Sequence, residues 1–495
     1  MQSIADVHGA IAQSDTEITI RKAFTYEDVL LVPRYSSIRS RKDVDTSTRL
    51  TRRLRLNTPI ISANMDTVTE SEMAIVMARR GGIGIVHRFN SIEQQVAQVR
   101  HVKRSESFVI EHPYTIDAGS TVGRARDMLD DYSITGLPVV DDEGCLAGLL
   151  SSRDILFVRD DSRLVRDVMT PGDRLITAPV GTTIAEAEEI LQIHKVEKLP
   201  LVDREGRLAG LITLRDILKR TLYPESSKDA KGRLLVGAAI GVADDYMERA
   251  VELRKVGCDV LVLDIAHGHS ENALSALREL RSRLDDVEII AGNVATAEGT
   301  RDLIDAGADA VKVGVGPGSI CITRVVTGVG VPQLTAVMDC VREADRQDVP
   351  VVADGGVRQS GDITKALAAG ASTVMIGNLL AGTRESPGVV VVRNGTRYKA
   401  SRGMASAEAT LERRRREKPG WEGETEFSDV VPEGVEGMVP FKGQVTEVLV
   451  QLVGGLRSGM SYLGARALGE LRDNATFVQI SNAGLSESSP HDVEL

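Results

Sequence analysis

A glycine-rich loop, residues 314–333, contains the best candidate for a nucleophile in the chain, Cys321. Three glycines and a proline separate this cysteine from an apolar run, 310–313, that is typical of a buried strand. Because glycine carries no side chain, the backbone amides and carbonyls of such a loop can approach a ligand closely. A thiolate is a strong nucleophile where its pKa is lowered. The loop therefore predicts covalent catalysis, although a lone cysteine is more often a small core residue.

Eight apolar runs, bounded by glycine or polar residues, account for the elements that must position this loop. They are residues 59–62, 83–86, 235–240, 260–264, 288–292, 310–314, 351–354 and 373–377. Such runs are typical of buried parallel strands that alternate with helices. Their number predicts an α/β fold with a (β/α)8 TIM barrel, although an open doubly wound sheet uses similar strands. Most runs end in polar or glycine-rich residues, and barrel active sites lie at those ends.

An insertion, residues 108–222, separates the second and third predicted strands and contains an internal repeat. LPVVD at 137–141 returns as LPLVD at 199–203, and RDIL at 153–156 returns at 215–218, with a constant offset of 62 residues. Two copies predict a paired module rather than an array. A hydroxyl residue precedes an aspartate by three positions in each copy, at Ser151 with Asp154 and at Thr213 with Asp216. We therefore predict barrel segments at 1–107 and 223–495, with the module between them.

Length, composition and charge limit the classes of protein to which the chain can belong. A chain of 495 residues, of which 42% are hydrophobic, is longer than one hydrophobic core usually supports, so we expect several domains. A net charge of −11 argues against nucleic acid as the main partner. The four cysteines lie far apart without zinc-ligand spacing, as in a reducing cytosol. We find no secretory signal and no run long enough to span a membrane, and expect a cytoplasmic protein.

Several motifs outside the insertion together resemble the IMP dehydrogenase/GMP reductase family. Besides the cysteine loop, they are SANMDTVTE at 62–70, DIAHGHS at 264–270, GNVAT at 292–296, ADGGVR at 353–358 and RGMAS at 402–406. They follow the family order and cover nearly all of the chain outside the insertion, which itself resembles a tandem CBS domain. In CBS pairs the aspartates, here Asp154 and Asp216, contact the ribose of adenine or guanine nucleotides. The alternative is that each aspartate only caps the following helix.

The resemblance implies a role for individual residues of the barrel. Catalysis would involve Cys321, Thr323 and Glu433. A purine monophosphate, GMP or IMP, would contact Ser319, Asp354, Gly356, Gly377, Asn378, Tyr398, Gly403, Met404 and Gly434. A dinucleotide would lie near Asp264, Ala266, Asn293 and Gly314. Backbone carbonyls of Gly316, Gly318 and Cys321 resemble the family's monovalent-cation site, which suits K⁺.

Two reactions of the family pass through the same adduct of the cysteine with C2 of the purine. In a dehydrogenase, C2 of IMP loses hydride to NAD⁺, and water activated by an Arg-Tyr pair on a mobile flap releases XMP. In a reductase, C2 of GMP loses ammonia with help from a threonine and a glutamate, and NADPH then delivers hydride to give IMP. The flap pair therefore distinguishes the two enzymes.

The flap, residues 405–437, favours the reductase. An approximate alignment places Gly420 and Trp421 where dehydrogenases carry Arg-Tyr, and neither can activate water. Thr323 and Glu433 match the reductase pair, although dehydrogenases keep similar residues. The CBS insertion and LLAGT at 379–383 are instead dehydrogenase-like. Arg413–Arg416 could replace the missing arginine or pair with the 2′-phosphate of NADPH, but a solvated helix face is the simpler interpretation.

We therefore predict an NADPH-dependent GMP reductase, with an NAD⁺-dependent IMP dehydrogenase as the alternative. A hypothesis of another class is a nucleotide sensor with a degenerate barrel, but the retained Cys321, Thr323, Asp264 and Glu433 argue against it. The resemblance further implies a homotetramer and allows CBS pairs to join tetramers into octamers.

Overall fold

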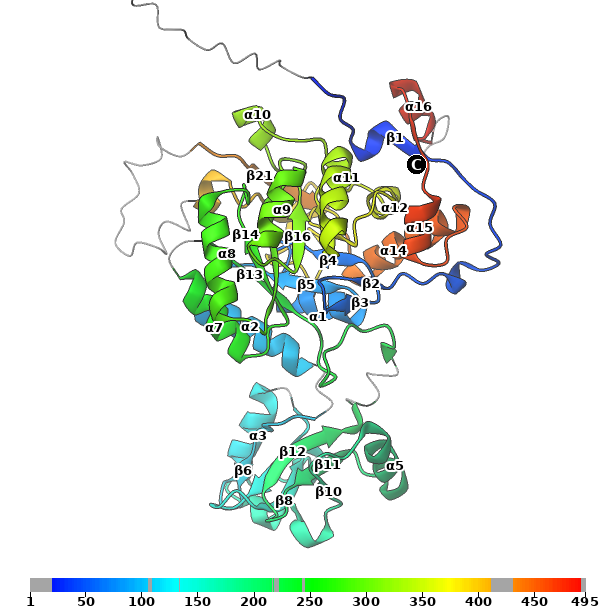
Figure 1. Ribbon diagram of the computed structural model, residues 1–495. Coiled ribbons are helices and arrows are strands. Elements are labelled where there is room, and N and C mark those ends of the chain that lie inside the picture. Colours follow the sequence, from blue (N-terminus) through cyan, green and yellow to red (C-terminus); the bar gives the residue numbers. More distant parts are fainter. Residues whose placement is uncertain are drawn as a thin grey trace, which may run out of the picture.

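The computed structural model describes residues 20–105, 109–132, 134–215, 217, 222–242, 245–410 and 431–490. Eight parallel strands form a closed barrel in the order β13-β14-β15-β16-β17-β18-β4-β5 (Figure 1). They are β4 (Ile60–Ser62), β5 (Ile83–Val86), β13 (Gly237–Ile240), β14 (Val260–Asp264), β15 (Glu288–Val294), β16 (Ala310–Val313), β17 (Val351–Asp354) and β18 (Thr373–Ile376). Each corresponds to one predicted run, so the predicted barrel is confirmed.

Alternation along each strand divides the core of the barrel into two parts. Val260 and Val262 belong to an inner cluster to which all eight strands contribute, whereas Leu261 and Leu263 pack outward with the helices. This two-residue period follows from the pleat of a strand. A hairpin formed by β2 (Thr48–Arg49) and β3 (Arg55–Leu56) adds its buried leucines to the inner cluster. Burial on both faces explains why the strands are continuous apolar runs.

Helices surround the barrel and cover the outward-facing side chains. They are α1 (Ser71–Arg79), α2 (Ile92–Ser105), α7 (Tyr246–Lys255), α8 (Glu271–Arg283), α9 (Ala297–Asp305), α11 (Gln333–Ala344) and α12 (Ser360–Ala368). Helix α14 (Val445–Tyr462) packs closely on α12, because a Cβ at Gly455 would lie 2.1 Å from the Ser360 hydroxyl oxygen. Among the helices of the described ranges, none is long and apolar enough to cross a membrane.

Smaller elements follow the barrel. A three-stranded antiparallel sheet consists of β19 (Val391–Arg393), β20 (Thr396–Arg402) and β21 (Glu436–Pro440). After α14 come α15 (Leu468–Asn474), β22 (Phe477–Gln479) and α16 (Asn482–Glu487), and β22 pairs with β1 (Val29–Leu31) near the other end of the chain. The predicted flap runs through this part of the chain, and its residues 411–430 lie outside the described residues.

The inserted repeat forms two similar sheets, which lie below the barrel in Figure 1. One sheet contains β6 (Ile116–Asp117), β7 (Gly136–Val140), β8 (Leu146–Ser151) and β9 (Thr170–Pro171), with helix α3 (Val122–Asp131). The other contains β10 (Ala178–Pro179), β11 (Lys198–Val202) and β12 (Leu208–Thr213), with helix α5 (Ile184–His194). Each half has its own apolar core.

The two halves meet through their equivalent hairpin turns. Cys145 and Arg207, which differ by the 62 residues of the repeat, form an antiparallel bridge. Around them, the amide of Leu146 donates to the Gly206 carbonyl and the amide of Leu208 donates to the Gly144 carbonyl, both at 3.1 Å. These reciprocal bonds between equivalent residues indicate pseudo-two-fold symmetry. The module is therefore a pair, as the repeat predicts.

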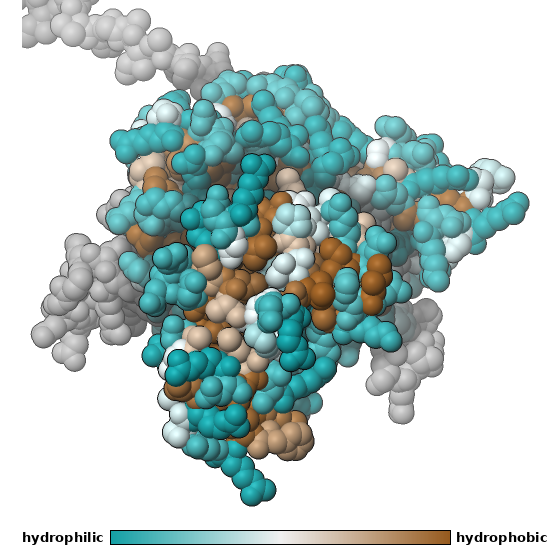
Figure 2. Space-filling view, turned by 90° about the horizontal axis from the view of Figure 1, so that it is seen from below, coloured by the Kyte–Doolittle hydropathy of each residue, from teal (hydrophilic) through white to brown (hydrophobic). Residues whose placement is uncertain are grey.

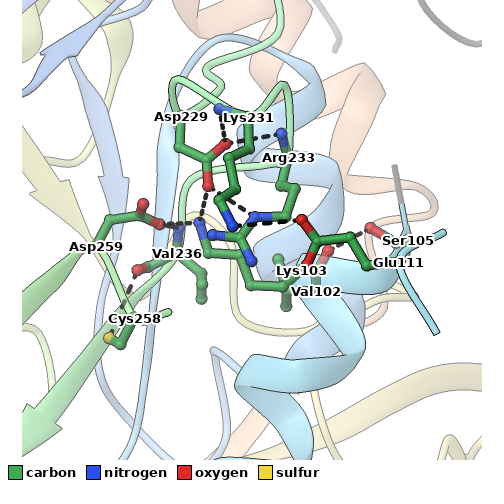
Figure 3. Close-up of polar contacts among 10 residues, drawn as sticks. All are labelled: Val102, Lys103, Ser105, Glu111, Asp229, Lys231, Arg233, Val236, Cys258 and Asp259. Atoms are coloured by element: carbon green, nitrogen blue, oxygen red, sulfur yellow. Dashed lines mark hydrogen bonds and ion pairs between the residues drawn. The ribbon is translucent and has the colours of Figure 1, made fainter. Parts of the chain in front are cut away.

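A buried charge cluster lies where the insertion joins the barrel (Figure 3). Lys103, near the end of α2, places its ammonium 3.0 Å from Asp229 and 2.6 Å from Asp259, and its side chain is 3% exposed. Asp259 immediately precedes β14, and Asp229 lies between the insertion and β13. Burial raises the pKa of Asp259, and the nearby Lys103 opposes this shift. The cluster thus ties both chain connections of the insertion to the base of the barrel.

We predict that replacing Lys103 by methionine destabilises the barrel, because two buried carboxylates lose their shared cation. The free energy of unfolding should fall by about 3 kcal/mol or more. Lys231→Met is the matched control, because Lys231 pairs with Glu111 at 3.3 Å on the surface and such pairs contribute at most about 1 kcal/mol. Urea denaturation measures both variants. Equal losses of stability would contradict the role assigned to the buried cluster.

Candidate active site

A cavity of about 330 Å³ lies at the carboxyl ends of the barrel strands. Residues that line it include Asn64, Met65, Arg88, Asp264, Ala266, Asn293, Lys312, Gly314, Gly316, Gly318, Cys321, Thr323, Asp354, Gly403, Met404, Glu433 and Gly434. They come from strand ends, from the glycine-rich loop and from the segments that flank β20 and β21. The cavity therefore collects residues from the full length of the barrel sequence.

The glycine-rich loop is held in place from both ends. Gly314 has φ +152°, and a Cβ there would lie 2.1 Å from the Asp354 carbonyl oxygen, so only glycine fits. Arg324, in the short helix α10 (Thr323–Thr327), donates through Nε to the Val315 carbonyl at 3.2 Å and through its guanidinium to the Val331 carbonyl. These bonds join the start of the loop to its end. The position of Cys321 therefore depends on the arginine three residues after it.

A chain of hydrogen bonds leads from the cysteine to a carboxylate. The Cys321 Sγ donates to Thr323 Oγ1 at 3.2 Å, and Thr323 Oγ1 donates to Glu433 Oε2 at 2.8 Å. The backbone maintains this arrangement, because the Ile322 amide donates to the Glu433 carbonyl at 2.8 Å and the Val435 amide donates to the Ile320 carbonyl at 3.0 Å. The chain offers a direct path for a proton between the thiol and Glu433.

A second polar group of the cavity lining is centred on Lys312. The Lys312 Nζ is 2.7 Å from Asp264 Oδ1 and 2.8 Å from Asp354 Oδ2, and it also donates to Asn293 Oδ1. The inner face of the barrel supplies these residues, since each charged one lies two positions after an inner apolar residue of its own strand. Burial opposes the charge, yet the two carboxylates raise the pKa of Lys312.

The structure places the predicted residues unevenly around the cavity. All predicted catalytic and dinucleotide residues line it, as do Asp354, Gly403, Met404 and Gly434 from the substrate set. Ser319, Gly356, Gly377, Asn378 and Tyr398 do not belong to the lining. Tyr398 instead lies within β20, paired with Pro440 of β21. The roles assigned to these five residues stay predictions.

Of the three carbonyl groups predicted to hold a cation, two accept no hydrogen bond from the described residues. Within the described residues, the carbonyl oxygens of Gly316 and Cys321 accept no hydrogen bond, whereas the Gly318 carbonyl accepts one from the Cys321 amide at 3.1 Å. A carbonyl oxygen has two lone pairs, so Gly318 can still coordinate an ion. Oxygen ligands of this kind suit K⁺. The loop is therefore compatible with the predicted site.

The predicted nucleotide residues of the insertion form a helix cap. Asp154 Oδ2 accepts bonds from both the amide and the hydroxyl of Ser151, each at 2.7 Å, at the start of α4 (Ser152–Ile155). Asp154 thus caps α4, as the alternative interpretation expects, and its contact with a nucleotide ribose stays a prediction. Thr213 ends β12, and Asp216 lies outside the described residues.

Two residues of the site escaped the sequence-based prediction. Lys312 stood inside a predicted strand, and a charged residue within a buried run is itself a signal of function. Arg324 follows the cysteine in the loop, but nothing in the sequence indicates that it spans the loop. Both act through contacts with segments distant in the chain.

Comparisons with known proteins identify the family of the chain. A sequence model described as the IMP dehydrogenase / GMP reductase domain matches residues 23–491. The inosine-5'-monophosphate dehydrogenase of Nitrosopumilus maritimus is 54% identical over 96% of this chain and 99% of its own. That of Aquifex aeolicus is 52% identical over 97% and 98%.

Among solved structures, the similar proteins include GMP reductases. A GMP reductase variant from Trypanosoma brucei, in complex with guanosine 5'-monophosphate, superposes with a TM-score of 0.91 at 47% identity. The match covers 96% of this chain and 99% of the trypanosomal one. Relatives with either name thus span nearly the whole chain. The chain belongs to the IMP dehydrogenase/GMP reductase family of purine nucleotide oxidoreductases.

Proposed function

We propose that the protein is a GMP reductase, which uses NADPH to convert GMP to IMP and ammonia. The hydrogen-bonded chain from Cys321 through Thr323 to Glu433 is the observation that carries this proposal. Removing an amine from C2 requires a proton for the leaving nitrogen, and this chain ends in a group that can provide one. The sequence of the flap lacks the Arg-Tyr pair of the dehydrogenases, and this also favours the reductase reaction.

The residues of the site divide the reaction between them. The thiol proton of Cys321 passes through Thr323 to Glu433, and the resulting thiolate forms a bond to C2 of GMP. The same path returns a proton to the 2-amino group, so that the C–N bond breaks, ammonia leaves and the purine stays bound to sulfur. Bound NADPH supplies the hydride that this carbon then takes up. The C–S bond breaks, IMP leaves, and the Cys321 thiolate takes up a proton from solvent to become the thiol again.

The dinucleotide is expected where Asp264, Ala266, Asn293 and Gly314 line the cavity. Oxidoreductases of this family use a nicotinamide cofactor. Asp264, Ala266, Asn293 and Gly314 all line the cavity beside the cysteine, and the two polar side chains can orient an amide group. These residues fit a nicotinamide ring. The preference for NADPH over NADH is proposed from the reductase assignment alone.

The alternative function is IMP dehydrogenase, with IMP, NAD⁺ and water as substrates. The names and identities of the curated relatives favour it. Both reactions use Cys321, so the adduct does not distinguish them. The dehydrogenase needs a base that activates water, and the described lining offers Glu433 for that role, a residue already bonded to Thr323. We therefore prefer the reductase.

We further propose that the insertion is a tandem CBS module that binds adenine or guanine nucleotides. Its paired sheets and pseudo-two-fold contacts support this assignment. A relative, the GMP reductase of Trypanosoma brucei, has been solved in complex with guanosine 5'-triphosphate. Within the described residues, the hydrogen bonds that Asp154 accepts from Ser151 both use Oδ2, which leaves Oδ1 available for a ribose hydroxyl.

Exposed apolar residues support the proposed assembly into tetramers and octamers. Figure 2 shows hydrophobic residues gathered in the middle of the lower face, bordered by hydrophilic ones. On the insertion, Leu156 is 64% and Phe157 is 89% exposed, and on the catalytic loop Val325 is 85% exposed. Apolar side chains exposed to this degree favour contact with another subunit.

Purified protein should oxidise NADPH in the presence of GMP and should leave NAD⁺ unreduced in the presence of IMP. Reduced-nicotinamide absorbance measures both reactions in parallel, with K⁺ present. Loss of absorbance in the first mixture alone supports the reductase. A gain in the second mixture alone would establish the dehydrogenase and overturn the proposal.

Thr323→Val should lower kcat with GMP by about 100-fold, because the isosteric side chain breaks the proton path between Cys321 and Glu433. The KM for GMP should change little, since the hydroxyl acts on protons rather than on binding. Thr327→Val is the matched control on the same short helix, where the hydroxyl donates to the Thr323 carbonyl at 2.7 Å and accepts from the Val329 amide at 3.1 Å, away from Glu433. Steady-state kinetics that show equal effects for the two variants would contradict this role.

A further inference from the structure

Lys312 uses its whole hydrogen-bonding capacity within the protein. An ammonium group has three donors, and Asp264, Asp354 and Asn293 each accept one. The side chain is 2% exposed although the residue belongs to the cavity lining. A bound ligand therefore meets the oxygens around Lys312 rather than the ammonium itself.

The two carboxylates on Lys312 both line the cavity, and they differ in their other hydrogen-bond partners. Asp354 accepts through Oδ2 from Lys312 at 2.8 Å and from Asn293 at 3.0 Å, which leaves Oδ1 for a ligand. Asp264 accepts through Oδ1 from Lys312 at 2.7 Å and through Oδ2 from Asn64 at 2.9 Å. Both carboxylates are 22% exposed. Protein donors thus hold both carboxylates, and Asp354 keeps one oxygen outside these bonds.

The Lys312 ammonium also offsets the repulsion between the two carboxylates. The two oxygens that share it lie at most 5.5 Å apart, the sum of their distances from Nζ. Two carboxylates this close in a partly buried site would not both stay ionised without a cation between them. Although burial alone would raise it, the pKa of Asp264 is lowered by Lys312. Lys312 therefore favours the charged, hydrogen-bond-accepting form of Asp264, and its ammonium lies between the two carboxylates.

We propose that Lys312 is a positioning residue that orients Asp354 toward the ribose hydroxyls of the purine nucleotide and Asp264 toward the dinucleotide. This inference rests on the proposed function of the cavity. It goes beyond it by assigning the discrimination between ribose and deoxyribose to a residue that touches neither substrate. A single cation thereby sets the geometry of both binding sites.

The test compares the dissociation constants of IMP and 2′-deoxy-IMP by calorimetry. IMP is common to both candidate reactions, so the comparison does not depend on the direction of catalysis. The native protein should prefer IMP by tenfold or more, as expected for a hydrogen bond to a charged acceptor. Lys312→Met should bring the ratio close to one, and Lys312→Arg, which keeps the cation, should restore most of it.

Lys365→Met is the matched control for the loss of a buried lysine. Lys365 lies in α12 and donates to the Tyr26 carbonyl at 2.8 Å, away from the cavity lining. This variant should lose stability but keep the preference for IMP. If Lys312→Met does not fold, the double variant Lys312→Met/Asp264→Asn keeps the net charge of the group, and it should also lose the preference.

The outcomes separate the inference from the proposed function. A native protein that binds neither nucleotide overturns the purine assignment of the cavity, and the inference with it. A native preference that survives in Lys312→Met, or in the double variant, overturns the inference alone. Loss of preference in Lys365→Met as well would show that stability rather than orientation is responsible, and would also overturn it.

Discussion

The two-residue period of the barrel strands is the constraint on which the site depends. In a closed barrel, every second side chain must point inward, and the inner layers are filled by residues such as Val262, Ala310 and Val352. Two residues further along the same strands, at the next inward positions, lie Asp264, Lys312 and Asp354. Barrel closure brings these charges together from separate strands. The geometry that buries apolar residues thus also assembles a polar group at the carboxyl end.

Two further segments complete the site above this group. The glycine-rich loop carries Cys321, and Arg324 fixes the loop at both ends. The segment before β21 supplies Glu433, and its backbone bonds to residues 320–322 keep the carboxylate near Thr323. Nucleophile and proton acceptor therefore share one set of backbone contacts. The charged group around Lys312 lies separately, on the strands of the barrel itself. A group that binds a ligand needs a rigid position more than it needs motion.

The sequence predicts the barrel well because each strand carries a local signal. The runs at 83–86, 260–264 and 351–354 match β5, β14 and β17 residue for residue, and the repeat predicts the paired module. Lys312 was missed as a functional residue because its partners lie 48 and 42 residues away, and only closure of the barrel joins them. Tyr398 was assigned by resemblance alone, and because it lies in β20 and is absent from the cavity lining, its role stays a prediction.

The central claim is that the chain removes an amine from C2 of a purine through Cys321 and the proton path to Glu433. GMP labelled with nitrogen-15 at its exocyclic amine tests this claim directly, because the label follows the bond that must break. Nuclear magnetic resonance should detect one labelled ammonium ion for each NADPH oxidised. Oxidation of IMP to XMP, with the label retained on GMP, would contradict the account.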